Sequence, residues 1–189
     1  MINQIIPSLT VIIIAFISAF SYNRTQVPIR KPGPSMPSFR YVYYYLQLST
    51  IVFTFSSYWS DSSLLFLTHK SIMLRYIGII ICFIAIVLFH KSLKFLGEQY
   101  SPCYNSVQPS KIITIGIYHY IRHPLYASNL LLLLGAFISS GSLIILLNLI
   151  VLFFYYLRAI NLEEKYLCKI FPNYKLYKKN TNKIFPWVY

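Results

Sequence analysis

The sequence predicts an all-α integral membrane protein, a helical bundle of about five transmembrane helices that includes a short C-terminal helical hairpin. Two observations carry this prediction. Of the 189 residues, 57% are hydrophobic and only 11% are charged, whereas a soluble domain carries about 25% charged residues. The apolar residues also lie in long blocks, and a helix needs about 20 of them to cross a bilayer. Because open strands leave backbone groups without partners in hydrocarbon, we expect these blocks to be helices.

Five apolar blocks give the expected order of the helices: residues 5–22, 41–59, 72–89, 125–139 and 143–157. Only Ser140-Gly141-Ser142 separates the last two, so they are expected to form an antiparallel hairpin. At a rise of 1.5 Å per residue, an arm of about 15 residues reaches about 22 Å, less than the ~30 Å hydrocarbon core. Either the hairpin stops short of the far surface, or flanking residues extend it.

The N-terminal part, residues 1–89, is expected to hold only transmembrane helices and their connections. Its first block has no basic segment before it and no small-residue cleavage site after it, which predicts a retained helix and not a signal peptide. The proline-rich stretch 30–37 cannot be helical, so it forms a surface connection. Residues 90–189 are expected to carry the functional core.

The net charge of +13 is spread over the connections and the tail. Residues 23–40 carry four bases and no acid, residues 90–124 four bases and one acid, and the tail from Arg158 seven bases and two acids. Basic residues gather on the cytoplasmic side of membrane proteins. With five crossings all three segments fall on that side, which predicts an outside N-terminus and a cytoplasmic active site. Because the bases form no single face, we expect no nucleic-acid partner.

Polar residues that could carry chemistry cluster on both sides of the expected hairpin. Pro124 is suited to the first turn of a helix, and that turn would present free amide groups and a positive dipole end beside Arg122. Such a helix start can bind an anionic group. It can equally be a membrane-interface start with a snorkelling Arg122 and an anchoring Tyr126. Because the hairpin returns the chain to its starting side, Glu163 and Glu164 are expected near this helix start.

No metal site is expected. His119 and His123 have the spacing of two ligands on one helix face, but the Glu of the His-Glu-x-x-His pattern and a third ligand are missing. The three cysteines show no Cys-x-x-Cys pairing. The sequence also lacks a glycine-rich phosphate loop and a nucleophilic serine motif.

An ordered set of motifs in residues 90–189 resembles the isoprenylcysteine carboxyl methyltransferase family, whose members are membrane-integral. It is also similar to the related methyltransferases of phospholipid amines. The motifs are Gly116-Ile117-Tyr118, Arg122-His123-Pro124-Leu125-Tyr126, the apolar hairpin, Leu162-Glu163-Glu164 and Phe171-Pro172-Asn173-Tyr174-Lys175-Leu176-Tyr177. The resemblance implies a methyltransferase that uses S-adenosylmethionine, with its cofactor pocket at the cytoplasmic ends of the last helices.

The same resemblance assigns expected roles to individual residues. Glu163 would hold a polar group of the cofactor, and a strand-like run from Ser110 to Ile113 would flank it. The residues expected to bind or flank the cofactor are Gln108, Ser110, Lys111, Ile112, Ile113, Tyr118, His123, Pro124, Leu125, Tyr126 and Glu163.

The acceptor is expected to be a lipophilic small molecule, a lipidated molecule or a membrane lipid that enters from the bilayer. Family members that act on prenylcysteine carry an arginine where this sequence has Ala159, which does not favour prenylcysteine here. The neighbouring Arg158 could grip an acidic acceptor with two hydrogen bonds. For an amine acceptor, His123 or Glu164 could act as the base.

The resemblance implies methylation of a carboxyl group on this acceptor, and three alternatives stay open. The first is an N-methyltransferase of phospholipid amines. The second is an NADPH-dependent reductase of the sterol type, although Tyr126 is followed here by Ala127-Ser128-Asn129 and not by the usual glycine and acid. The third is a membrane scaffold without enzymatic activity, which would leave the clustered polar residues unexplained.

Overall fold

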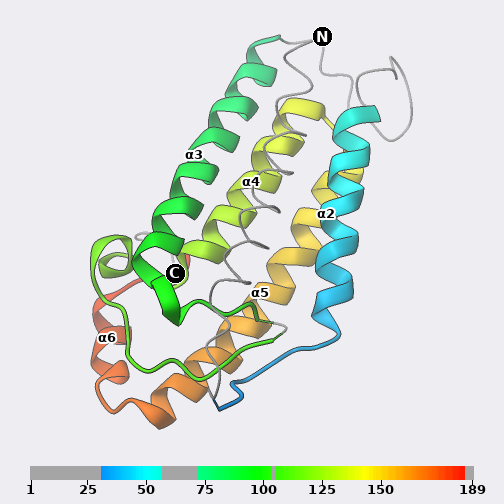
Figure 1. Ribbon diagram of the computed structural model, residues 1–189. Coiled ribbons are helices and arrows are strands. Elements are labelled where there is room, and N and C mark those ends of the chain that lie inside the picture. Colours follow the sequence, from blue (N-terminus) through cyan, green and yellow to red (C-terminus); the bar gives the residue numbers. More distant parts are fainter. Residues whose placement is uncertain (1–30, 57–71, 104, 186–189) are drawn as a thin grey trace.

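The computed structural model describes residues 31–56, 72–103 and 105–185, and within these ranges the chain forms five α-helices and no strand (Figure 1). Two short 3-10 helices, η1 (Gly97–Gln99) and η2 (Gly116–His119), lie in the connections. The predicted first block, residues 5–22, lies outside the described residues. The α-helices are α2 (Phe39–Ser56), α3 (Ile72–Leu96), α4 (Pro124–Ser140), α5 (Leu143–Ile170) and α6 (Tyr174–Asn180).

The four long helices pack in the order α3, α4, α5, α2 (Figure 1). The largest contact, between α3 and α4, brings two backbones together at Gly78 and Gly135. A Cβ atom at Gly78 would lie 2.6 Å from the carbonyl oxygen of Gly135, and one at Gly135 would lie 2.7 Å from that of Gly78. Both distances are too short for carbon and oxygen, so only hydrogen fits. Small residues at such crossings are typical of membrane helices.

The predicted hairpin is present, but its second arm is much longer than predicted. Gly141 ends α4 with φ of 68°, a left-handed conformation that glycine adopts at little cost. Helix α5 then runs for 28 residues, about 42 Å at 1.5 Å per residue. The sequence analysis predicted an arm of about 15 residues because the apolar residues end at Leu157. No glycine or proline follows until Pro172, so the helix continues through the polar cluster.

Two of the described helical segments are long and apolar enough to cross a membrane: α3 with η1 (Ile72–Gln99), and α5. Helix α4 is apolar but shorter. Large apolar side chains of α3 point away from the bundle, with Met73 69% and Phe83 66% exposed. A continuous exposed apolar face of this kind suits contact with lipid chains. The described residues do not test the predicted five crossings, and the outside N-terminus stays a prediction.

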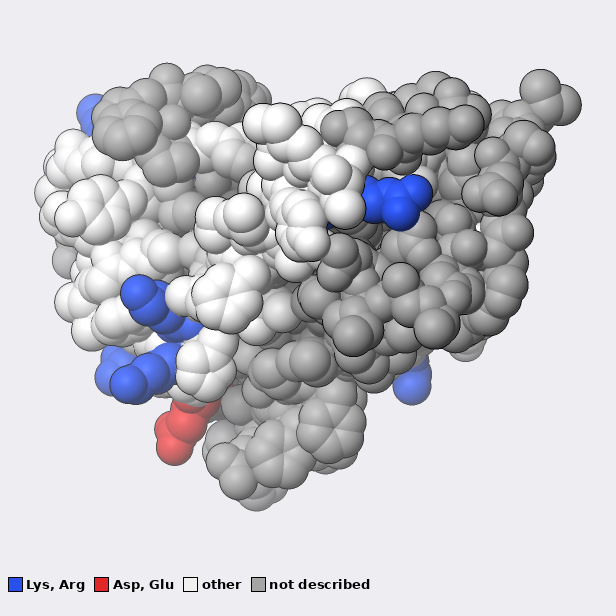
Figure 2. Space-filling model, turned by 90° about the horizontal axis from the view of Figure 1, so that it is seen from above, with Lys and Arg blue, Asp and Glu red and all other residues white. Residues whose placement is uncertain are grey.

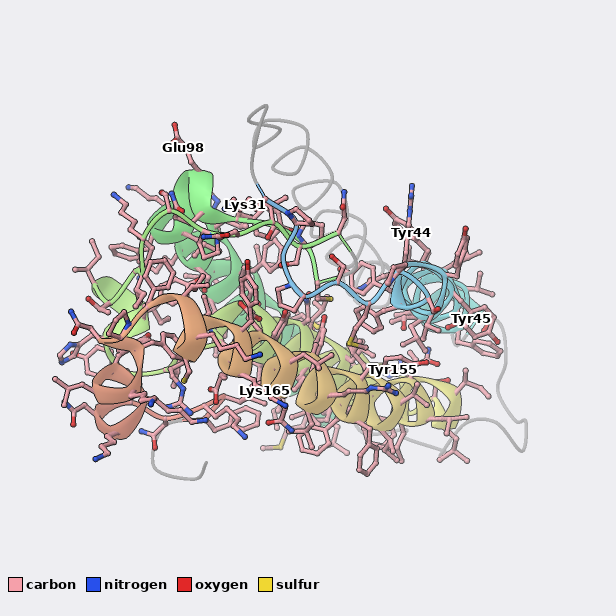
Figure 3. The ribbon with its side chains drawn as sticks, turned by 90° about the horizontal axis from the view of Figure 1, so that it is seen from below. Lys31, Tyr44, Tyr45, Glu98, Tyr155 and Lys165 are labelled. Carbon is pink, nitrogen blue, oxygen red and sulfur yellow. The ribbon has the colours of Figure 1, made fainter. Side chains whose placement is uncertain are left out.

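Several connections meet at one end of the bundle, here called the loop end and made of the described residues 31–38, 97–103, 105–123 and 171–185, whereas the turn between α4 and α5 lies at the other end (Figure 1). Backbone hydrogen bonds join its segments: Gln108 N donates to Lys31 O at 2.8 Å and Arg122 N to Asn182 O at 2.9 Å. Figure 3 looks onto this end, where Lys31, Glu98 and Lys165 are labelled. Seen from the opposite side, Lys and Arg side chains of described residues are visible at several scattered places (Figure 2). Lys31, Lys111 and Lys183, one from each predicted basic segment, lie in the segments that the backbone hydrogen bonds join.

Candidate active site

The loop end contains the start of α4, where the chain turns sharply into the bundle. Pro124 is the first helical residue, as its position in the sequence predicted. His123 precedes it as the N-cap, and its carbonyl accepts the first helical hydrogen bond from Ala127 N at 3.1 Å. The backbone N–H groups of Leu125 and Tyr126 have no carbonyl within the helix to bond to. The helix therefore presents two amide donors and its positive end here.

Beside this helix start, Arg122 and Glu164 form a buried ion pair. Arg122 Nε donates to Glu164 Oε1 at 2.7 Å, and the two side chains are 6% and 2% exposed. Arg122 Nη1 also donates to the carbonyl oxygens of Lys178, at 3.0 Å, and of Thr181. Lys178 Nζ lies 2.7 Å from Glu164 Oε2. The guanidinium thus joins the start of α4 to α5 and α6, with its Nε and Nη1 bonded within the protein.

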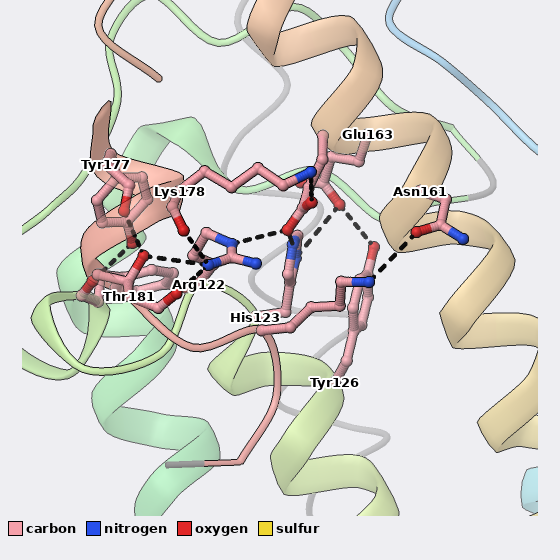
Figure 4. A network of polar contacts seen from close by, with 11 residues as sticks. Arg122, His123, Tyr126, Asn161, Glu163, Tyr177, Lys178 and Thr181 are labelled. Atoms are coloured by element: carbon pink, nitrogen blue, oxygen red, sulfur yellow. Dashed lines mark hydrogen bonds and ion pairs between the residues drawn. The ribbon is translucent and has the colours of Figure 1, made fainter. Parts of the chain in front are cut away.

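His123 lies between the two adjacent glutamates (Figure 4). Its Nε2 is 3.3 Å from Glu164 Oε1 and its Nδ1 is 3.7 Å from Glu163 Oε2. The hydroxyl of Tyr126 donates to Glu163 Oε2 at 3.1 Å, and its ring stacks on that of His123 with centroids 5.5 Å apart. The side chain of Glu163 is 38% exposed. The two acids therefore differ: Glu164 is enclosed by cations, whereas Glu163 has an accessible carboxylate.

A cavity opens beside Glu163 and extends between α2, α4 and α5. Its accessible part is bounded by Glu163, Lys111 and the loop around Pro109, and its enclosed part by aromatic and apolar side chains. Tyr118 in the wall donates to Ser92 O at 3.4 Å. Burial, and next the negative charge of Glu163, raise the pKa of Tyr118 well above its usual value, so this hydroxyl stays protonated.

Most residues that the sequence analysis expected at a cofactor site line this cavity. They are Lys111, Ile112, Ile113, Tyr118, His123, Pro124, Leu125, Tyr126 and Glu163. Gln108 and Ser110 do not line it but are bonded close by. Gln108 Oε1 accepts from the hydroxyl of Tyr166 at 3.2 Å, and Ser110 N donates to Gln99 Oε1 at 2.8 Å.

Three expectations differ from the geometry. The run Ser110 to Ile113 was expected to be strand-like, but it is irregular chain, because no neighbouring segment pairs with it in the described part of the protein. Arg158 is exposed and does not line the cavity. Glu164 also lies outside the cavity wall, where it is buried against Arg122, His123 and Lys178.

The structure adds cavity residues that sequence reasoning missed, among them Tyr100, Asn129 and Tyr156. A signal for Asn129 was present, since it is an amide in an otherwise apolar helix. Lys178, which contacts Glu164, gave no signal, because it is one of several lysines in a basic tail. No group of three metal-binding side chains is found in the described ranges.

A comparison with protein families identifies a relationship. A sequence model of the family described as phospholipid methyltransferase matches residues 73–174, just over half of the 189 residues. This range contains nearly all of α3, the loop with η2, and the whole of α4 and α5. It therefore includes most of the cavity wall and both members of the Arg122–Glu164 ion pair. No curated protein matches the chain at a significant level.

Proposed function

Because the chain belongs to the phospholipid methyltransferase family, a membrane-integral family related to the isoprenylcysteine carboxyl methyltransferases, we propose that it transfers a methyl group from S-adenosylmethionine to a lipid amine. The cavity beside the start of α4 is the proposed reaction site. One observation carries the proposal. The same cavity has an accessible carboxylate and the amide groups of a helix start at one end, and aromatic side chains at its enclosed end. Family membership also favours a methyltransferase over the reductase and scaffold alternatives.

The chemistry of the cavity wall fits the cofactor. S-adenosylmethionine has an ammonium, a carboxylate and an adenine ring, and it supplies a methyl group on a positively charged sulfur. Glu163 offers a carboxylate for the ammonium, and the amides of Leu125 and Tyr126 offer donors for the carboxylate. Ile112 and Ile113 offer apolar surface for the adenine. The ammonium and the carboxylate of the cofactor thus each have a complementary group in this wall.

Several residues have the proposed task of holding the site in shape. The ion pair between Arg122 and Glu164 fixes α4 against α5, so that Glu163, the next residue, keeps its place. The hydroxyl of Tyr126 orients the Glu163 carboxylate at 3.1 Å. Since methyl transfer depends mainly on alignment at about 3–3.5 Å and on exclusion of water, rigid walls contribute directly to the rate.

The enclosed end of the cavity favours an amine over a carboxylate as the acceptor. Among the described residues, the lysine and arginine side chains in the wall are those of Lys111, which is exposed, and Arg122, which is held by Glu164. Arg158 lies outside the wall, so it is poorly placed to grip a carboxylate there. The rings of Tyr126 and Tyr156 stack at 4.5 Å in the enclosed part. Aromatic faces attract an alkylammonium group through their quadrupoles.

An amine that arrives as an ammonium must lose a proton before it can accept a methyl group. Glu164 is a poor proton acceptor, because Arg122 and Lys178 stabilise its charged form at 2.7 Å each. His123 lines the cavity and contacts both glutamates. We assign the proton to His123, which it reaches through water in the cavity, because His123 is the imidazole in the cavity wall.

Cofactor binding provides the direct test. Purified protein in detergent should bind S-adenosylmethionine and not NADPH, as measured by calorimetry. Replacing Glu163 with glutamine should weaken this binding by about 1.5–3 kcal/mol, the loss expected when a charged hydrogen bond is removed. Glu98→Gln is the matched control, because Glu98 is exposed and lies outside the cavity wall. Binding of NADPH in place of S-adenosylmethionine would refute the proposal, and equal effects of the two substitutions would remove Glu163 from the site.

A further inference from the structure

Asn129 and Tyr156 form a buried polar pair in the enclosed part of the cavity. Asn129 Nδ2 donates to the hydroxyl of Tyr156 at 2.9 Å, and the two residues are 6% and 1% exposed. Both line the cavity. The second polar atom of the amide, Asn129 Oδ1, is fully buried and has no hydrogen-bond partner among the described residues. The pair therefore holds an acceptor oxygen without a partner among the described residues, in a side chain that lines the cavity.

Without a ligand, this unpartnered oxygen lowers the stability of the fold. A buried acceptor without a donor loses the hydrogen bonds that water would give it. Asn129 lies in a helix of mainly apolar residues, where leucine would fill the space without that cost. A ligand with an N–H or O–H group would remove this penalty, and Asn129 lines the cavity in which such a ligand would bind.

The position along α4 fits a ligand that reaches inward from the cofactor site. His123, Tyr126 and Asn129 are spaced three residues apart, so they lie near one face of the helix start. Six residues correspond to about 9 Å along the helix axis. His123 and Tyr126 contact Glu163 at the accessible part, whereas Asn129 contacts Tyr156 in the enclosed part.

The side chains around Asn129 Oδ1 indicate which chemical group would bind there. The ring of Tyr156 stacks on Tyr126 at 4.5 Å and meets the edge of Phe39 at 5.9 Å. The amide oxygen accepts a hydrogen bond and the ring faces favour positive charge. A carboxylate would have neither a proton for Asn129 Oδ1 nor an attraction to the rings. A neutral aliphatic amine has an N–H donor, and its nitrogen becomes positively charged as it takes the methyl group from the sulfonium.

We propose that Asn129 and Tyr156 form the subsite that binds the acceptor nitrogen, with Asn129 Oδ1 accepting its N–H and the Tyr156 ring facing its positive charge. The proposal rests on the proposed function, which it deepens by assigning the acceptor end of the cavity. Neither residue is expected to contribute to cofactor affinity. Their effect should therefore fall on the Michaelis constant for the lipid amine.

Two variants and one matched control test this subsite. Asn129→Leu removes the free oxygen with little change of volume, and Tyr156→Phe removes only the hydroxyl that positions the amide. The control is Asn148→Leu, because Asn148 is also buried and donates to Ser49 Oγ at 2.7 Å, but lies outside the cavity wall. Each protein is assayed with vesicles containing phosphatidylethanolamine, and its affinity for S-adenosylmethionine is measured separately.

We expect Asn129→Leu and Tyr156→Phe to raise KM for the amine about tenfold, as for the loss of one buried hydrogen bond, with cofactor affinity unchanged. Asn148→Leu should leave KM near that of the wild type. If either cavity variant matches the control in KM, or loses cofactor affinity in parallel, the subsite assignment is refuted. Should Asn129→Leu fail to fold, Tyr156→Phe decides alone. A wild-type protein that binds cofactor but methylates no amine refutes the proposed acceptor itself, a result that does not depend on the variants.

Discussion

Replacing Glu164 with glutamine removes the negative charge from the centre of the buried cluster while it keeps the shape of the side chain. Arg122 would remain 6% exposed in its side chain and would lose the carboxylate that lies 2.7 Å from its Nε. Leaving one member of a buried ion pair without its partner costs about 3–5 kcal/mol. The side chain of Lys178 is 46% exposed, so it can turn to solvent and adds little to this cost.

The matched substitution is Lys178→Met, which removes the outer cation and leaves the pair between Arg122 and Glu164 intact. Its expected cost is at most about 1 kcal/mol, as for a partly exposed ion pair. Both variants are compared with the wild type by denaturant unfolding in mild detergent, followed by circular dichroism. Equal losses of unfolding free energy in the two variants would refute the buried pair as the element that holds α4 on α5.

Three further predictions concern the fold. Gly135→Ala should lower the free energy of unfolding by about 1–3 kcal/mol, because its Cβ would overlap a backbone carbonyl of α3; unchanged thermal unfolding would contradict this contact. Burial raises the pKa of Tyr177 to about 12 from 10.0, and its neutral hydroxyl donates to Tyr118 O at 2.6 Å. The stability that this hydroxyl contributes is therefore complete below pH 10 and is lost as the pH rises towards 12. Between pH 10 and 12 the free energy of unfolding should therefore fall less in Tyr177→Phe than in the wild type. An equal fall in both proteins would contradict this role of the hydroxyl. Cysteines introduced at Ser35 and Asn180 should react with impermeant thiol reagents from the same side of sealed vesicles, whereas labelling from opposite sides would contradict the shared loop end.

The local features of the fold could be predicted because single residues determine them. Pro124 starts α4 since it lacks the N–H that a helix interior needs. Gly141 ends the same helix with a positive φ. The length of α5 could not be predicted from hydropathy, because apolar residues mark the part of a helix that lies in hydrocarbon and not its end in the loops.

The position of Arg158 outside the cavity wall has a simple geometric reason. Tyr156, Ile160 and Glu164 are spaced four residues apart and form the buried face of α5. Arg158 is two residues from Tyr156, which is about 200° around the helix at 100° per residue. It therefore points away from the cavity. The angular positions of these residues around the helix could have predicted that Arg158 points away, whereas its closeness to Glu163 in the sequence could not.

The contacts of Arg122 could not be derived from the sequence. Its partner Glu164 is 42 residues away, and the carbonyls of Lys178 and Thr181 are 56 and 59 residues away. Several acids and bases of the loop end could have paired in other combinations. Only the packing of α4 on α5, and of α6 beneath them, selects this arrangement.

The central claim is that the protein methylates a lipid amine, and transfer of a labelled methyl group tests it most directly. Purified protein is incubated with methyl-labelled S-adenosylmethionine and vesicles that contain an amine lipid, and the lipid fraction is then treated with alkali. The account predicts label in the lipid headgroup that survives this treatment as an N-methyl group and is strongly reduced in Glu163→Gln. Label released as methanol would identify a methyl ester and contradict the amine acceptor. A protein that binds the cofactor yet transfers no label to lipid would contradict the claim as a whole.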